Sequence, residues 1–175
     1  MEAVRDEQCK KSFEELIRRY FSMIHQTCYR LTLDWHHAED LAQEVMNRIY
    51  LHRHQYKPTA KFKSFAMTVA INRCRDFLRS RKSSLRNDTV ELAALLESAP
   101  ATPLELTEQA HHVRQALAQL PEVYREVLVL RHYEGLQFRE IAELLDVPRG
   151  TVASRMAKAL KLIESKIAHL NLELS

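Results

Sequence analysis

The fold of this chain is decided by residues 137–163, which read QFREIAELLDVPRGTVASRMAKALKLI. Apolar residues recur at helical spacing on both sides of a break at residues 146–149, where Pro148 stops the first helix from continuing. The pattern predicts two helices, at about 137–145 and 150–169, joined by a turn of about four residues. Their shared core is expected to contain Leu136, Ile141, Leu145, Val147, Val152, Met156 and Leu160. The segment is a candidate helix-turn-helix.

The second of these helices has a basic and polar face near its N-terminus. No acidic residue occurs between Arg149 and Leu162. Short polar and basic side chains at this end of a helix suit reading of the DNA major groove. A plain helical hairpin with a solvated face fits the spacing alone equally well. The candidate DNA contacts are Arg149, Thr151, Ser154, Arg155 and Lys158.

The composition favours helices throughout. The 175 residues include only two glycines, fewer than tight hairpins or phosphate-binding loops require. The three cysteines, Cys9, Cys28 and Cys74, form no CxxC pair, which favours reduced thiols over a disulfide framework. No apolar run is long enough to span a membrane, and no signal peptide opens the chain. We therefore expect an all-α, cytoplasmic protein without stable membrane insertion.

Helical spacing also predicts three helices in the first half, at about 9–33, 35–52 and 62–81, with Asp34 as the N-cap of the second. In the second half, helices are expected at about 108–119 and 121–133. Pro121 would take the first helical position of the latter, and Gly135 would end it.

The charge distribution divides the chain into three parts. Residues 1–84 carry 16 Lys and Arg against 10 Asp and Glu, whereas residues 85–108 carry 1 against 5. We expect two small helical domains, at 1–84 and 107–175, joined by a flexible acidic linker at 85–106.

The expected third helix has a basic stripe beside its apolar one. Basic side chains along one face suit contact with a DNA backbone, and the amide of Asn72 among them is available to the edge of a nucleobase. Aromatic and basic residues just before it could hold an unstacked base. A solvated charged helix, with Phe62 and Phe65 in the core, is the alternative. The candidate contacts are Tyr56, Lys57, Lys61, Lys63, Phe65, Thr68, Asn72, Arg75 and Arg79.

The expected second helix has an acidic and amide face that is unsuited to DNA. Such a face fits a protein partner, although an ordinary solvated face explains the pattern equally well. The candidate contacts are Asp40, Gln43, Glu44 and Asn47.

Taken together, these segments resemble the extracytoplasmic-function (ECF) sigma factors, group 4 of the sigma-70 family. Residues 38–46 (AEDLAQEVM) are similar to the polymerase-binding helix of that family, and residues 62–79 (FKSFAMTVAINRCRDFLR) to its promoter −10 segment. Residues 120–131, 134–142 and 147–155 (LPEVYREVLVLR, EGLQFREIA and VPRGTVASR) are similar to its −35 domain. The resemblance covers nearly all of the chain outside the linker.

The resemblance implies a transcription initiation factor that binds core RNA polymerase and promoter DNA. Asp40, Gln43, Glu44 and Asn47 would face the β′ coiled coil, and the C-terminal domain would contact the β flap. Asn72 would hold a base flipped from the −10 element, with Arg75 and Arg79 on nearby phosphates. Ser154, Arg155 and Lys158 would work at the −35 element. An anti-sigma factor is a further implied partner, and the acidic linker would thread the RNA channel of the polymerase.

Two positions depart from related patterns. Thr68 and Val69 stand where housekeeping sigma factors have two tryptophans that aid melting, so only well-matched promoters should melt. Ala153 and Ala157 occupy recognition-helix positions that are often basic or bulky in relatives, which leaves more of the reading to DNA shape.

Other functional classes fit the sequence less well. The nine histidines form no metal-spaced set and no nucleophile motif occurs, so we expect no enzyme activity, metal or cofactor. A sigma-like decoy that sequesters an anti-sigma factor would not need the basic cluster at residues 73–82. A conventional helix-turn-helix regulator would need a ligand or receiver domain, for which the first half shows no pattern.

Overall fold

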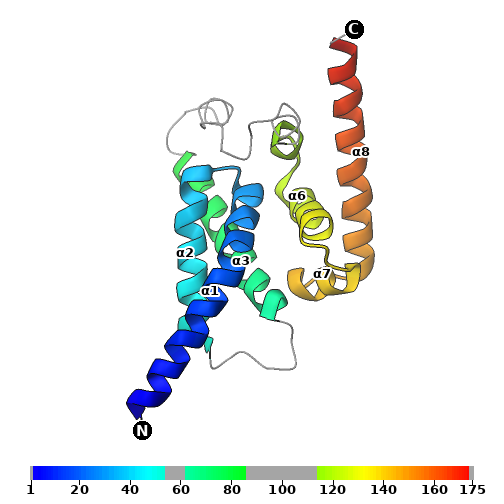
Figure 1. The fold of residues 1–175 in the computed structure, drawn as a ribbon. Helices are drawn as coiled ribbons and strands as arrows, with labels where there is room; N and C mark the ends of the chain where they lie inside the picture. Colours follow the sequence, from blue (N-terminus) through cyan, green and yellow to red (C-terminus); the bar gives the residue numbers. More distant parts are fainter. Residues whose placement is uncertain (1, 54–61, 86–113, 174–175) are drawn as a thin grey trace. The chain divides into compact units, whose positions relative to one another are not determined.

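The computed structural model describes residues 2–53, 62–85 and 114–173. Every regular element within these ranges is a helix, which confirms the all-α class. The chain divides into two compact units, Met1–Ser83 and Ser84–Ser175 (Figure 1). Of the expected linker at 85–106, only residue 85 lies within the described ranges. None of the described helices is long and apolar enough to cross a membrane.

The described residues of the first unit form three α-helices, α1 (Glu2–Thr32), α2 (Trp35–Leu51) and α3 (Phe62–Leu85). Helix α1 packs along α2, and its first turns run past the end of α2 (Figure 1). The core lies where the apolar stripes of the three helices meet, and it includes Ile24, Cys28, Leu41, Val45, Met67, Ile71 and Cys74. Burying one large apolar side chain contributes about 1.5–3 kcal/mol, so these stripes hold the unit together.

The turn between α1 and α2 is tight and locally strained. Leu33 has a left-handed backbone with φ of +59°, which costs a residue with a Cβ about 1–2 kcal/mol. Its amide donates to the carbonyl of Tyr29 at 2.7 Å, and its side chain is buried. Asp34 is the N-cap of α2, as predicted, because its side chain accepts a hydrogen bond from the amide of His37.

The second unit contains a helical stretch at 114–118, followed by α6 (Glu122–Leu128), a π-helical segment η2 (Val129–Tyr133), α7 (Phe138–Leu145) and α8 (Arg149–Glu173). Helix α8 packs against both α6 and α7, and its last turns extend beyond them (Figure 1). Gly135 ends the preceding helix with φ of +68°, as expected from its position.

Helices α7 and α8 form the predicted helix-turn-helix. Gln137 and Glu140 cap the start of α7 with a reciprocal capping box. Asp146 ends the helix in a left-handed conformation, and the amide of Val147 donates back to the carbonyl of Ala142 at 3.1 Å. This Schellman-type hydrogen bond turns the chain without glycine.

Several details of the sequence prediction were wrong. Leu160 was expected in the core but is 45% exposed, and the neighbouring Ala159 is fully buried instead. Pro121 is the N-cap of α6 rather than its first helical residue. The helices at both ends of the first unit are longer than expected, because α1 begins at Glu2 and α3 reaches Leu85.

Candidate functional site

The α3 basic face consists of Thr68, Asn72, Arg75, Arg79 and Lys82, which follow one another at helical spacing. The side chains of Asn72, Arg79 and Lys82 are exposed, whereas Thr68 and Arg75 are half-buried. The hydroxyl of Thr68 donates to the carbonyl of Ser64 at 3.0 Å, so it already has an acceptor within its own helix. The exposed amide and bases leave a surface on which a polyanion could lie.

The start of α3 is anchored by aromatic rings. The ring of Phe62 lies 4.8 Å from that of Tyr20 on α1, and 6.4 Å from that of Phe65. Phe62, Lys63 and Phe65 are all half-buried. Side chains in the first turn of α3 therefore pack partly against the core and remain partly accessible to solvent. The candidate contacts Tyr56, Lys57 and Lys61 lie outside the described residues.

The α2 polar face is exposed as predicted. Asp40, Gln43, Glu44 and Asn47 all point away from the core, since the buried residues of α2 occupy the opposite side. Such a face of acids and amides repels a phosphate backbone but complements a basic protein surface.

One member of that face is joined to α3. The carboxylate of Glu44 accepts a hydrogen bond from Nε of Arg73 and forms an ion pair with it. The hydrogen bond from Arg73 lowers the pKa of Glu44, partial burial opposes the shift, and the charges of Arg73 and Arg48 add to it. The pair neutralises the charge of Arg73, which lies beside the α3 basic face, and the charge of Glu44 on the α2 polar face.

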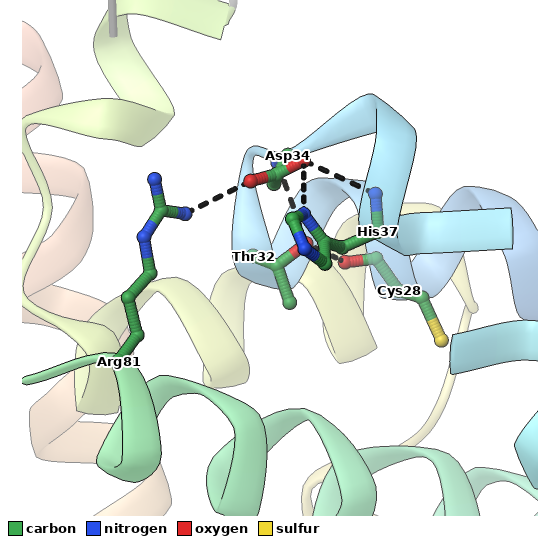
Figure 2. A network of polar contacts seen from close by, with 5 residues as sticks. All are labelled: Cys28, Thr32, Asp34, His37 and Arg81. Atoms are coloured by element: carbon green, nitrogen blue, oxygen red, sulfur yellow. Dashed lines mark hydrogen bonds and ion pairs between the residues drawn. The ribbon is translucent and has the colours of Figure 1, made fainter. Parts of the chain in front are cut away.

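A clasp of polar contacts joins the end of α3 to the turn between α1 and α2 (Figure 2). Oδ2 of Asp34 lies 3.0 Å from Nη1 of Arg81, while Oδ1 accepts from the amide of His37 at 3.1 Å. The hydroxyl of Thr32 donates to the carbonyl of Cys28 at 2.8 Å and lies 3.4 Å from the amide of Asp34. We call Thr32, Asp34, His37 and Arg81 the α1–α3 clasp.

The acid of the clasp is held in its charged form. Burial alone would raise the pKa of Asp34, but hydrogen bonds from His37 and the charges of His37 and Arg81 together lower it below its ordinary value of 3.8. The sequence identified Asp34 only as a helix cap. No local pattern signals its pairing with Arg81, because the two residues are separated by 47 positions.

The N-terminal half of α8 presents the expected basic surface. Arg149, Ser154 and Lys158 are exposed, and Thr151 and Arg155 are half-buried. The hydroxyl of Ser154 donates to the carbonyl of Thr151 at 3.0 Å. Within the described part of the chain no acid pairs with Arg149, Arg155 or Lys158, so their charges are available to a ligand.

The described side chains offer no group of three or more His, Cys, Asp or Glu residues that could hold a metal ion. The candidate chemistry is therefore that of two cationic helix surfaces and one acidic helix surface. Such surfaces bind polyanions and proteins.

Each of the two units is similar to a known protein family. A family model described as sigma-70 region 2 matches residues 16–84, and one described as sigma-70, region 4 matches residues 111–163. The ECF RNA polymerase sigma factor SigW of Bacillus subtilis is 28% identical, with 95% of this chain and 96% of the relative covered. The ECF RNA polymerase sigma factor SigE of Mycolicibacterium smegmatis is 30% identical, covering 95% of this chain and 66% of the relative.

Solved structures share the fold. The sigma factor RpoE from Bartonella quintana, in complex with the anti-sigma factor NepR, matches with a TM-score of 0.79 at 19% identity, covering 90% of this chain and 98% of that one. CnrH in complex with the cytosolic domain of CnrY matches with a TM-score of 0.69 at 18% identity, covering 91% and 90%.

Proposed function

Because this chain belongs to the extracytoplasmic-function sigma factors of the sigma-70 family, we propose that its three described surfaces divide the work of promoter-specific transcription initiation. The single observation that carries this proposal is the opposition of charge within the first unit. The α2 polar face is acidic and exposed, and the α3 basic face is cationic, with Asn72, Arg79 and Lys82 exposed. One small unit thus offers one surface to a protein and another to DNA.

The α2 polar face is proposed to bind the β′ coiled coil of core RNA polymerase. Asp40, Gln43 and Asn47 are exposed and supply a carboxylate and two amides. All three groups can accept hydrogen bonds from basic side chains, and the two amides can also donate to backbone carbonyls. Glu44 is the fourth member, and in the free protein it is paired with Arg73.

The α3 basic face is proposed to hold the −10 element. Asn72 is exposed midway along the helix and can donate to and accept from a base edge. Arg75 and Arg79 would meet neighbouring phosphates, and Thr68 would pack beside them. The segment containing Tyr56, Lys57 and Lys61, with Lys63 and Phe65, would receive the flipped base.

The helix-turn-helix of the second unit is proposed to bind the −35 element. Arg149, Thr151, Ser154, Arg155 and Lys158 line the N-terminal half of α8, where recognition helices enter the major groove. Ala153 and Ala157 are exposed on the same half and have no polar group for base contacts. DNA shape should therefore carry part of the specificity at this element. The β flap of core polymerase is proposed as a further protein contact.

The proposal places the protein in the cytoplasm with the polymerase. The acidic segment at 85–106 is proposed to link region 2 (residues 1–84) to region 4 (residues 107–175) and to pass through the RNA channel. An anti-sigma factor is a proposed partner, because the two structural neighbours named above are both described in complexes, one of them with an anti-sigma factor. No catalytic residue is proposed.

Run-off transcription with core polymerase on genomic fragments tests the proposal. The wild-type chain should start transcripts from a subset of fragments. Asn72→Ala should abolish open-complex formation, read by permanganate reactivity of unpaired thymines, yet leave core binding unchanged. Ser80→Ala, exposed on the same helix, is the matched control and should behave as wild type. Equal opening by the Asn72 variant and wild type would remove that residue from the −10 site.

A further inference from the structure

We propose that Asp34 is a positioning residue for promoter DNA, acting through Arg81 to hold the last turns of α3 in place. This inference rests on the proposed −10 role of the α3 basic face. It assigns different functions to basic residues that look equivalent in the sequence: Arg79 meets DNA, and Arg81 fastens the helix that carries Arg79.

Core packing weakens toward the end of α3. The fully buried stripe of the helix ends at Cys74, Phe77 and Leu78 are half-buried, and the residues from Arg79 to Ser83 are all polar or charged. Helix turns with few buried apolar contacts open locally at low free energy. Two basic residues of the α3 basic face, Arg79 and Lys82, lie on these turns. Contacts that fix the turns therefore also fix the positions of these two positive charges.

The α1–α3 clasp supplies such a contact (Figure 2). The side chains of Asp34 and Arg81 are only 16% and 26% exposed, and their atoms approach to 3.0 Å. One turn earlier on α3, the ring of Phe77 lies 5.0 Å from that of His37. The final turns of α3 are therefore fastened to the start of α2 by an ion pair and a ring contact.

The carboxylate is itself held rigidly. Its second oxygen accepts the capping hydrogen bond from His37, and the amide of Asp34 lies beside the hydroxyl of Thr32. Its backbone follows the left-handed Leu33, whose side chain is buried. An acceptor that is fixed on both sides can define the position of Arg81, whereas a freely rotating surface acid could not.

The clasp also gives Arg81 a role other than DNA contact. Its guanidinium is turned toward Asp34 and half-buried, whereas Arg79 is exposed and has Asp76 at 3.7 Å as an ion-pair partner. Arg81 is thus expected to add nothing to the number of phosphates neutralised by the holoenzyme. That number is measurable, because each phosphate contact contributes about −0.7 to −0.9 to the slope of log affinity against log salt.

The test uses full-length variants reconstituted with core polymerase and a forked −10 promoter DNA. Asp34→Asn keeps the capping oxygen for His37 but removes the charge that binds Arg81, and Arg81→Met removes the other partner while keeping its stem. Each variant should weaken DNA binding by about twofold to fivefold, within the range for one partly exposed ion pair. The double variant should be no weaker than the single ones. Core affinity and the salt slope should both equal those of wild type.

Two controls separate positioning from general destabilisation and from direct contact. Thr27→Val removes the hydrogen bond from a buried hydroxyl of α1 to the carbonyl of Met23 and lies outside the clasp, so it should lower stability and leave DNA affinity unchanged. Arg79→Ala should weaken DNA binding and reduce the slope of log affinity against log salt by about 0.7–0.9, the contribution of one phosphate contact. Wild-type DNA affinity in both Asp34→Asn and Arg81→Met, or a reduced slope in Arg81→Met, would overturn the inference. Failure of wild type itself to start any transcript would instead overturn the proposed function.

Discussion

Replacing Glu44 with Gln and Arg73 with Met, singly and together, measures how strongly the two faces of the first unit are joined. The Glu44 side chain is 48% exposed and that of Arg73 is 21% exposed, so water screens the pair considerably. For such a pair we expect a coupling free energy of about 0.5–1 kcal/mol. Each single variant should lower the free energy of unfolding by about that amount, and the double variant should lose little more.

Urea unfolding of the isolated protein at low and high salt is the assay. The coupling should shrink at 1 M salt, where the Debye length is about 3 Å. Ser80→Ala, exposed on α3, is a control that changes no charge and leaves the pair in place. A coupling within error of zero at low salt would show that the contact contributes nothing to stability. Glu44 would then be as available to a partner as Asp40 is, and the link between the two faces would be lost.

Three further predictions concern other parts of the chain. Asp40→Ala combined with Gln43→Ala should weaken retention on core polymerase in co-purification, and unchanged retention would remove the α2 polar face from that interface. Because the pKa of Asp34 is lowered from 3.8, the unfolded state binds more protons between the two pKa values. The stabilisation by Asp34 should be fully present above about pH 4 and lost as pH falls through the folded pKa. Urea unfolding against pH checks this, since Asp34→Asn should differ from wild type at pH 7 and converge with it in acid. Gly135→Ala should cost about 1 kcal/mol in thermal unfolding, because φ is +68° even though an added methyl group would meet nothing within 4 Å. Gly150→Ala, at the second residue of α8 and equally free of neighbours, should stabilise by up to about 0.5 kcal/mol; the same sign for both substitutions would refute the backbone argument.

Local patterns predicted most of the fold. Helical periodicity placed α2 and α3 closely, the capping role of Asp34 followed from its residue type, and Pro148 marked the turn of the helix-turn-helix. These features depend on residues within about one turn of each other, which is why the sequence suffices. Exposure of the α2 polar face and the α8 basic surface followed from the same periodicity.

The buried side of α8 was predicted less well. Leu160 fits the apolar spacing of α8 but is 45% exposed while its neighbour Ala159 is fully buried, so the covered side of the helix at this level includes Ala159 and not Leu160. The π-helical turn at Val129–Tyr133 was likewise missed, since it changes the hydrogen-bond register without altering the residue types.

The sequence by itself determined roughly where the described helices lie and which of their faces are charged. Only the tertiary structure decided which charges remain available. Arg73 and Arg81 read as members of one basic cluster, yet each is paired with an acid 29 or 47 residues earlier in the chain. The physical reason is that ion pairs depend on how α3 crosses α1 and α2, and that crossing is set by packing of the whole core rather than by any local pattern.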